Sequence, residues 1–420
     1  MKAMIQFARA NKNLLTILLF STAYIAVVAN IQGFKAMLPL VQEEFQISRT
    51  QVGFYSSFYF ISTVLLSIFS GRIVDYLGTK KGLILGVAVT GLMMFLHSLS
   101  PHYTLILILA LFTGIALSLI TPSVNKGLFE IVEPSKRSTS LGIVYAGGGV
   151  GGFLGAVLLP FFGEMLGWRT ALIFSSLLAV LVAFVIYKFY RPRVIHANGK
   201  TDSPPEITGS LKEDLFFLLR NRYLLSIFSM GIIFGLSISS ITGHFAIFLT
   251  RDINFSASQA GLGLGLFHIG GVIGQPAWGL FNDKVFKGDR RKGLALLGLL
   301  IALQSFFFGL VVSRFDFPPY AILAFSFLLG FCVLGIITLY FTTVSEQVPQ
   351  SYIGVVTGLA LIFPRATTVL APPLFGLVAD LSGTYALSWF LMGTAVLLLT
   401  VGFIYFSGKY SNFSSLKSQP

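Results

Sequence analysis

Twelve long apolar stretches follow one another along this chain of 420 residues, and they limit its fold more than any other feature. A helix needs about 20 mainly apolar residues to cross a bilayer. Stretches of suitable length lie at 13–40, 50–71, 82–99, 104–128, 139–163, 170–190, 224–249, 258–281, 293–312, 320–344, 353–379 and 385–407. Because 55% of the residues are apolar and only 11% are charged, lipid must cover part of the surface. The sequence therefore predicts an all-α membrane protein with twelve transmembrane helices.

Positively charged residues are distributed unevenly among the connections between these stretches. If the N-terminus is cytoplasmic, the cytoplasmic segments carry 22 of the 29 Lys and Arg residues. The outer loops carry four, at Arg49, Arg169, Arg251 and Arg314. This bias predicts a multi-pass protein of the plasma (inner) membrane with both termini in the cytoplasm. The same bias explains the net charge of +13, so nucleic-acid binding is not needed to account for it. We expect the first apolar stretch to be a retained helix rather than a signal peptide.

Two short motifs recur in the second half of the chain with the same offset. Residues 48–53 (SRTQVG) match 256–261 (SASQAG), and residues 71–75 (GRIVD) match 279–283 (GLFND), in both cases 208 positions further on. A weaker match pairs 160–163 with 373–376. Internal repeats of this kind are typical of transporters built from duplicated bundles. We therefore predict two pseudo-symmetric six-helix bundles, at 1–190 and 223–408.

A polar connection at 191–222 separates the two predicted bundles. Residues 198–205 (NGKTDSPP) have the composition of a loop. Residues 211–220 space their apolar side chains for one face of a helix, which predicts either a short helix on the cytoplasmic membrane surface or a loosely helical linker. Residues 409–420 are expected to form a cytoplasmic tail.

The connection after the second stretch resembles the loop signature of the major facilitator superfamily. The residues that carry the resemblance are Gly71, Asp75, Gly78, Lys80 and Lys81, with a degenerate second copy at Asp283, Arg290 and Arg291. The resemblance covers the whole chain and implies a secondary transporter that works by alternating access, without a cofactor and not an enzyme. In this loop we expect the first Gly to allow close helix approach and the Asp to accept bonds from a neighbouring helix N-terminus. The basic pair would anchor the cytoplasmic face.

Within that superfamily, residues 121–169 are similar to the organic-anion carriers of the anion:cation symporter branch. The similarity rests on Pro122, Asn125 and Lys126 and on the sequence GWR at 167–169. Two positions depart from family patterns. Ala110 stands where the family often has an Arg in helix four, which weakens a proton-coupling role there. Ala156 follows Gly155 where drug antiporters carry a Gly-Pro pair, which counts against drug–proton exchange.

Glycines recur at four-residue spacing in the fifth stretch, at Gly147, Gly151 and Gly155, and the eighth stretch is also rich in glycine. Small residues at this spacing let helices touch backbone to backbone. The resemblance implies that these two helices form a sliding seam between the halves. Plain packing within a bundle would use the same residues.

Ionisable side chains are few inside the spans, and none away from the ends is acidic. Because a charge within a bilayer is costly, such residues are functional candidates. They are Arg365, Lys35, His244, His268 and Lys126. Arg365 lies beside Pro364 in the middle of the eleventh span and could clamp a carboxylate with two parallel hydrogen bonds. The alternative is a structural Arg bonded to backbone carbonyls.

The remaining candidates differ in depth. Lys35, four to six residues from the outer end of the first span, is expected either to meet the substrate or to snorkel outward, and His244 has a matching depth in the seventh span. His268, central in the eighth span, would either titrate or stay neutral and bonded to a carbonyl. Lys126 is expected to snorkel toward lipid headgroups. Neutral candidates for substrate contact, or for packing, are Asn30, Gln32, Tyr55, Tyr59, Tyr145 and Tyr340.

Positive charge without negative charge inside the spans favours an anionic solute. We therefore expect a monomeric transporter of a small organic anion, a carboxylate or sugar acid, with protons as possible co-substrate and lipids around it. Anion exchange fits the sequence as well. Two alternatives stay open: an exporter or flippase of an amphiphile such as a drug or lipid, and a membrane sensor that kept the fold without transporting. The single Cys332 offers neither a disulfide nor a metal site.

Overall fold

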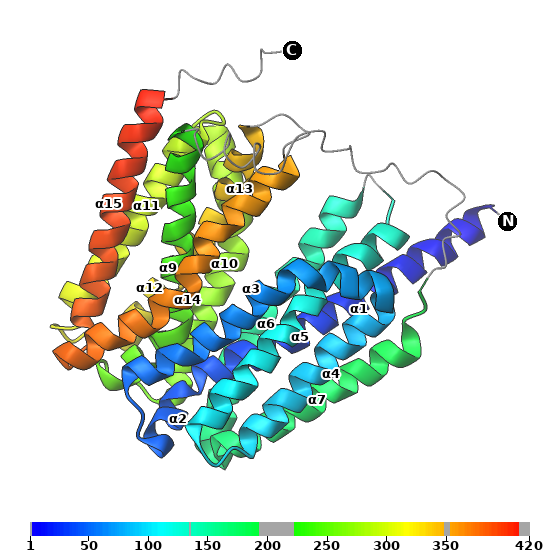
Figure 1. The fold of residues 1–420 in the computed structure, drawn as a ribbon, viewed down its shortest axis with the longest axis horizontal. Coiled ribbons are helices and arrows are strands. Elements are labelled where there is room, and N and C mark those ends of the chain that lie inside the picture. The colour runs from blue at the N-terminus through cyan, green and yellow to red at the C-terminus, as the bar shows by residue number, and fades with distance from the viewer. Residues whose placement is uncertain (1, 134–135, 193–221, 348–352, 411–420) are drawn as a thin grey trace. The chain divides into compact units, whose positions relative to one another are not determined.

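The computed structural model describes residues 2–133, 136–192, 222–347 and 353–410 (Figure 1). These residues form helices and short connections. The helical elements are α1 (Lys2–Ala36), α2 (Leu38–Phe45), α3 (Arg49–Leu77), α4 (Thr79–Ser98), α5 (Tyr103–Ile131), α6 (Arg137–Leu166), α7 (Trp168–Phe189), α9 (Arg222–Arg251), α10 (Ala257–Val285), α11 (Arg290–Phe306), the π-helix η2 (Phe307–Val312), α12 (Pro319–Val333), α13 (Ile336–Glu346), α14 (Ile353–Ser382) and α15 (Ala386–Tyr410).

These helices confirm the predicted all-α fold of twelve membrane spans. Ten of the described segments are long and apolar enough to cross a bilayer, where α11 with η2 counts as one segment and α12 with α13 as another. Helix α3 is an eleventh span if its two parts, which meet at a bend of 65° between Ser67 and Phe69, are taken together. The twelfth is α10, whose 29 residues reach about 43 Å at 1.5 Å per residue. Its glycines and polar side chains such as Gln259 and Gln275 lower its hydropathy.

The described chain divides into two compact units that do not follow the central linker. The first unit comprises Met1–Ile195 and Phe245–Ile269, and the second comprises His196–His244 and Gly270–Pro420. The C-terminal end of α9 and the N-terminal part of α10 thus belong with the first unit. The predicted linker helix at 211–220 and the predicted tail from 411 onward lie outside the described residues.

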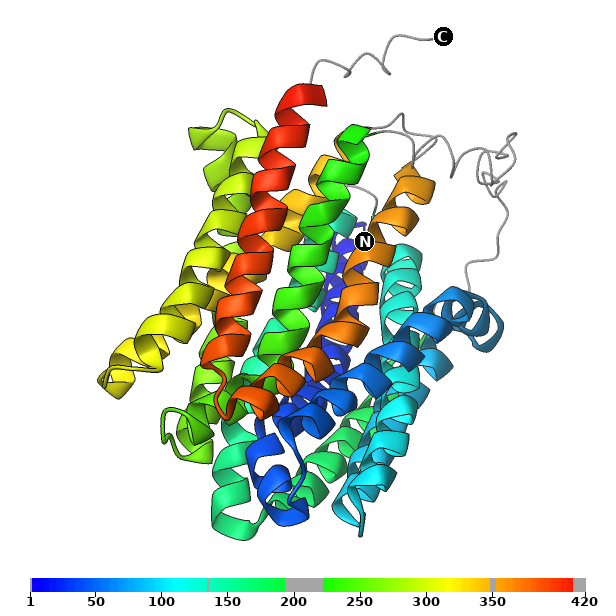
Figure 2. The same cartoon turned by 60° about the vertical axis from the view of Figure 1, so that its left-hand side comes forward.

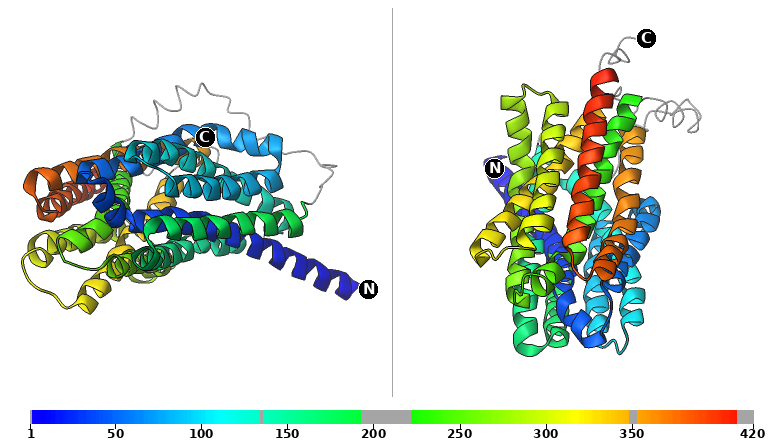
Figure 3. Two further views of the ribbon diagram at one scale, coloured as in Figure 1. Left: turned by 90° about the horizontal axis from the view of Figure 1, so that it is seen from below. Right: turned by 90° about the vertical axis from the view of Figure 1, so that its left-hand side faces the viewer.

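Each unit is held by a few long helix pairs. In the first unit α1 packs along α6, α3 along α5, and α4 along both α5 and α7 (Figure 2). In the second unit α15 packs along α11 and its η2 extension, and α14 contacts α13 and α15 (Figure 3). These pairings bury the apolar faces against one another and leave the opposite faces to lipid.

Two predicted spans are broken where a backbone hydrogen bond is lost. The first stretch was expected to run to residue 40, but α1 ends at Ala36 because Pro39 has no N–H to donate to the Lys35 carbonyl. The tenth stretch breaks between α12 and α13 at Leu334 and Gly335. There the Trp278 indole donates to the Phe331 carbonyl at 3.1 Å, the acceptor that the Gly335 N–H would use in a regular helix.

The repeated sequence motif is a repeated helix cap. At the start of α3 the Ser48 hydroxyl accepts from the Gln51 N–H at 3.1 Å, and the Gln51 side chain accepts from the Ser48 N–H at 2.8 Å. At the start of α10 Ser256 and Gln259 make the same two bonds at 3.2 and 3.0 Å. Each is a capping box, which satisfies two backbone donors that a helix start leaves unpaired.

The glycine row of the fifth span packs α6 onto α1 within the first unit. A Cβ added to Gly155 would lie 2.0 Å from the Ala29 carbonyl oxygen, and one added to Gly151 would lie 2.6 Å from the Ile25 carbonyl oxygen. Gly147 also faces Ile25. This row therefore packs against α1, as plain packing within a bundle predicts. The eighth span does face the fifth: Cβ atoms added to Gly261 and Gly265 of α10 would lie 2.3 Å from the Ala156 carbonyl oxygen and 2.7 Å from Val157 Cγ2 of α6, and sliding at this contact stays a prediction.

Candidate functional site

Lys35 is the most deeply buried cation of the described spans. It is the second-last residue of α1, and only 1% of it is exposed. Its ammonium lies 5.3 Å from the ring centre of Tyr59 and 4.9 Å from that of Phe60, both on α3. The expected outward snorkelling is wrong, because the side chain is directed onto these two ring faces. Aromatic faces attract a cation, most strongly where water is excluded.

His268 of α10 belongs to the same unit and interacts electrostatically with Lys35. Its ring rests against Gly152 of α6, where an added Cβ would lie 2.7 Å from His268 Cγ. The residue is 6% exposed, and its Nε2 has no hydrogen-bond partner among the described residues. The structure therefore places Lys35 against Tyr59 and puts both in one unit with His268, three residues that the sequence singled out separately.

A second polar group of this unit joins α1, α5 and α6. The Tyr145 hydroxyl donates to Asn125 Oδ1 at 2.5 Å, and its ring lies edge-on to Tyr24 at 5.5 Å between centres. Tyr24 in turn is hydrogen-bonded to Thr121. Sequence reasoning named Tyr145 but not Tyr24 or Asn125 as site residues; the polar character of both inside a span was the available signal.

Three other residues of the first unit that the sequence named as candidates for substrate contact mainly contact the protein itself. The Asn30 amide donates to the Ala26 carbonyl at 2.9 Å and lies 3.5 Å from that of Ser175, so it ties α1 to α7. Tyr55 is fully buried against the Phe34 ring, and its hydroxyl has no partner among the described residues. Gln32 is half-buried, and its carbonyl oxygen is likewise unpartnered within the described chain.

In the second unit, Arg365 is half-buried near the middle of α14. Pro364 beside it presses on α9: a Cβ added to Gly235 would lie 2.2 Å from the Pro364 carbonyl oxygen. Because Pro364 has no N–H, the Ala360 carbonyl loses its helical donor. The Tyr340 hydroxyl replaces that donor at 2.7 Å. Tyr340 thus fixes the helix around Arg365.

His244 makes two hydrogen bonds within the second unit. Its Nε2 lies 2.8 Å from the Pro372 carbonyl, so this nitrogen carries the proton and donates. Its Nδ1 lies 3.0 Å from the Tyr385 hydroxyl and accepts from it. A neutral ring satisfies both bonds, and this residue holds α9 against α14 at the Pro372–Pro373 pair.

The first signature loop contains an ion pair that the sequence did not predict. The Lys126 ammonium of α5 donates to Asp75 at 2.7 Å, so the expected snorkelling to headgroups is wrong. Gly78, with φ +82° and ψ 155°, is the junction between α3 and α4. Lys80 lies over the Tyr187 ring at 5.1 Å, and Lys81 is exposed. Gly71 has open space around it; the close helix contact expected there is absent.

The second signature copy forms a similar charge cluster in the second unit. Arg290, at the start of α11, donates to Asp283 at 2.6 Å and to Glu346 of α13 at 3.4 Å. Arg291 contacts Asp289 and donates to the Ser407 carbonyl of α15 at 3.4 Å. Both copies therefore pair the signature Asp with a basic residue from a neighbouring helix or turn.

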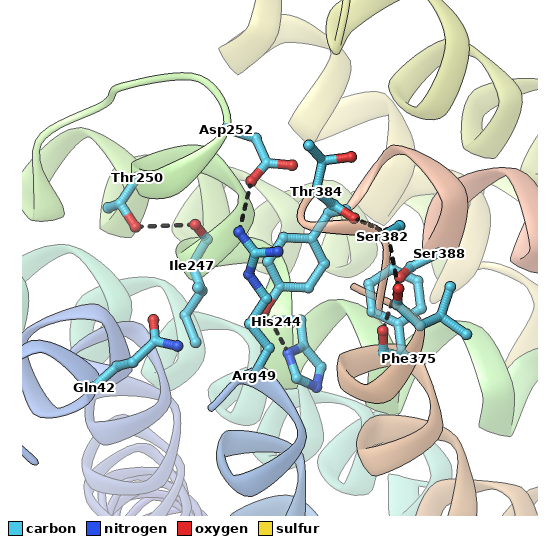
Figure 4. A network of polar contacts seen from close by, with 12 residues as sticks. Gln42, Arg49, His244, Ile247, Thr250, Asp252, Phe375, Ser382, Thr384 and Ser388 are labelled. Carbon is cyan, nitrogen blue, oxygen red and sulfur yellow. Dashed lines mark hydrogen bonds and ion pairs between the residues drawn. The ribbon is translucent and has the colours of Figure 1, made fainter. Parts of the chain in front are cut away.

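Arginines that the sequence analysis used only to predict the membrane orientation form ion pairs within the first unit. Arg49 lies 3.7 Å from Asp252 (Figure 4), and these side chains are only 17% and 7% exposed. Arg251 lies 3.8 Å from Glu43. Glu44 accepts hydrogen bonds from the Arg169 guanidinium and from the Trp168 indole. Sequence spacing gives no signal for these partners, because they come from connections far apart in the chain.

A membrane protein with twelve spans, an internal repeat and a signature loop in each half is built as a secondary transporter. The chain belongs to the major facilitator superfamily, whose family model matches residues 20–363 and 227–419. Members of this family are transporters and not enzymes.

Known proteins extend this similarity over nearly the whole chain. The chain is 20% identical over 403 residues to a hexuronate transporter of Bacillus subtilis (strain 168), covering 94% of this chain and 95% of that protein. It is 26% identical over 282 residues to a gallate transporter of Pseudomonas putida, covering 60% and 62%. A crystal structure of a bacterial homologue of the human lysosomal transporter Spinster, inward-facing and unoccupied, shares the fold with a TM-score of 0.73 at 15% identity, covering 96% of this chain and 97% of that one.

Proposed function

We propose that this transporter moves a small organic anion, a carboxylate or sugar acid, across the membrane by alternating access. The observation that carries the proposal is the burial of the Lys35 ammonium against the rings of Tyr59 and Phe60. A cation held in a dry setting is stabilised further by an anion that arrives beside it. The relatives named for hexuronate and gallate transport support this class, because both solutes carry a carboxylate.

Arg365 supplies the second cation of the proposal, on α14 in the other half of the chain. Its guanidinium can bind a carboxylate through two parallel hydrogen bonds, which gives orientation as well as attraction. Hydrogen bonds to charged groups contribute about 1.5–3 kcal/mol, equivalent to roughly 10- to 150-fold in affinity. Loss of either cation is therefore expected to lower apparent affinity within this range.

The coupling that we propose is symport with a proton, with His268 as the proton-binding side chain. The Nε2 of His268 has no hydrogen-bond partner among the described residues and can accept a proton. His244 is less suited, because both of its nitrogens are hydrogen-bonded. In proteoliposomes, uptake of the anion that an inward proton gradient drives in the wild type but not in His268→Gln would support this coupling; wild-type uptake that the gradient does not stimulate, or equal stimulation in His268→Gln, would contradict it.

The decisive experiment is counterflow in proteoliposomes with a labelled hexuronate, gallate and an uncharged hexose. We expect exchange of one of the carboxylates and none of the hexose. Lys35→Met should reduce exchange at least tenfold while Lys35→Arg retains part of it, and Arg365→Ala should behave like Lys35→Met. Lys188→Met is the matched control, because Lys188 also lies over a ring, that of Phe189, but at the exposed end of α7.

Three results would contradict the anion proposal. They are exchange of the uncharged hexose at the rate of the carboxylates, wild-type exchange in both cation variants, and an equal loss in the Lys188 control. Correct insertion of each variant is checked by its yield and its elution as a single species from a size-exclusion column.

We also propose that the protein is a monomer in the inner membrane with both termini in the cytoplasm, as the 22 basic residues of the predicted cytoplasmic segments favour. Because Cys332 is buried, a cysteine introduced near either terminus can be labelled selectively in whole cells. Labelling by a membrane-impermeant maleimide before lysis would disprove the orientation. Light scattering of the purified protein tests the monomer.

A further inference from the structure

An open groove lies between α9 and α15 in the second unit, next to the ends of both helices. Its volume is about 500 Å³, within the 300–1,000 Å³ typical of small-ligand pockets. Arg222, the first residue of α9, stands at its mouth. Deeper in, Leu225 and Ser226 form one wall and Leu398, Gly402 and Phe406 form the other.

The polarity of the groove changes along its length. The Ser226 hydroxyl donates to the Tyr223 carbonyl of its own helix at 2.6 Å, so its proton is not available to a ligand. Leu398 and Phe406 are exposed and apolar, and Leu398 lies twelve residues before the end of α15, about 18 Å along the helix. The groove thus has a cation where the helices leave the bilayer and an apolar floor below it.

Further positive charge lies at the same end of α15. Arg291 donates to the carbonyl of Ser407, five residues after Gly402, and Lys409 is the next-to-last residue of the helix. Asp289 neutralises part of this charge through its contacts with Arg291 and Lys292. Basic pockets between membrane helices near the bilayer surface favour anionic headgroups over neutral ones.

We propose that this groove binds one anionic phospholipid, with its phosphate on Arg222 and one acyl chain along Leu398 and Phe406. The opening of the groove toward exposed apolar side chains favours a lipid that enters sideways from the bilayer over a soluble anion. The site is separate from the residues proposed to hold the transported solute, and its occupancy does not depend on that proposal. Its function is to bind α9 to α15 near the membrane surface, so the bound lipid stabilises the second unit.

Gly402 offers a direct way to fill the groove. A Cβ at Gly402 meets nothing within 4 Å, and the same holds for Gly408 on the same helix, which does not line the groove. Gly402→Phe places a ring in the groove, and Gly408→Phe is the matched control. Arg222→Gln removes the charge at the mouth, and Arg222→Lys keeps it.

The test measures phospholipid binding to the purified protein in detergent, by native mass spectrometry and by the rise in thermal unfolding temperature. Dioleoyl phosphatidylglycerol should give a one-to-one adduct and a higher unfolding temperature, and dioleoyl phosphatidylcholine should give neither at the same concentration. Gly402→Phe should abolish both effects while Gly408→Phe keeps them. Arg222→Gln should weaken binding about fivefold, with Arg222→Lys close to wild type.

Four results would overturn the proposal. If the wild type forms no one-to-one adduct, either another part of the chain fills the groove or the groove stays empty. Equal effects of the two phospholipids would remove the role of charge. Competition by glycerol 3-phosphate would identify a site for soluble phosphate instead. Undiminished binding to Gly402→Phe would place the lipid elsewhere.

Discussion

The contact between α1 and α6 allows one stability effect to be worked out from the structure. A Cβ added to Gly155 would lie 2.0 Å from the Ala29 carbonyl oxygen, whereas ordinary Cβ contacts begin at 3.4 Å. In Gly155→Ala the two helices must therefore separate locally by about 1.4 Å. Overpacking of this kind costs about 1–3 kcal/mol, and it acts here against two rigid backbones. The helix-propensity gain of Ala over Gly, about 1 kcal/mol, offsets only part of it.

Gly142 of the same helix provides the control, because a Cβ added there meets nothing within 4 Å. Gly142→Ala should keep the propensity gain and become slightly more stable. We expect Gly155→Ala to unfold several degrees below wild type in detergent and Gly142→Ala to unfold at or above it. The assay is thermal unfolding followed by size-exclusion chromatography of heated samples. Equal unfolding temperatures of the two variants would refute the inference that Gly155 is required for close α1–α6 packing.

Three further outcomes are expected in the first unit. Asp252→Asn should lower the free energy of unfolding by about 3 kcal/mol, because the mostly buried Arg49 side chain then loses the carboxylate that faces it. The double variant Arg49→Asp with Asp252→Arg should recover part of this loss, and no recovery would argue against a direct pair. Burial raises the pKa of Glu44, but hydrogen bonds from Arg169 and Trp168 and the Arg169 charge outweigh this and hold the pKa below its usual value of 4.5. The stabilisation by Glu44 is then complete above pH 4.5 and is lost as the pH falls through the lowered pKa, so the unfolding temperatures of wild type and Glu44→Gln should converge only in acid. Gly78→Ala should cost about 1–3 kcal/mol, since φ +82° with ψ 155° is a region open almost only to glycine; an unchanged unfolding temperature would contradict this.

The sequence determined the class of fold because the bilayer imposes a length and a composition on every span. The twelve apolar stretches and the 208-residue offset were visible without any contact being known, and even the repeated Ser-x-x-Gln cap at Ser48 and Ser256 is local in the chain. The effect of Pro364 was also readable, because a missing N–H frees a carbonyl wherever the residue stands.

Only the tertiary structure decided which partner each polar side chain takes. Sequence depth alone left Lys35 and Lys126 both able to snorkel, and the structure places one on aromatic rings and the other on Asp75. The donor that replaces the missing N–H of Pro364 is Tyr340, twenty residues from the carbonyl that it serves. Such pairings depend on how helices rotate about their axes and pack, which hydropathy does not encode. For the same reason the glycine row of α6 could be recognised as a packing surface, but the helix that covers it could not.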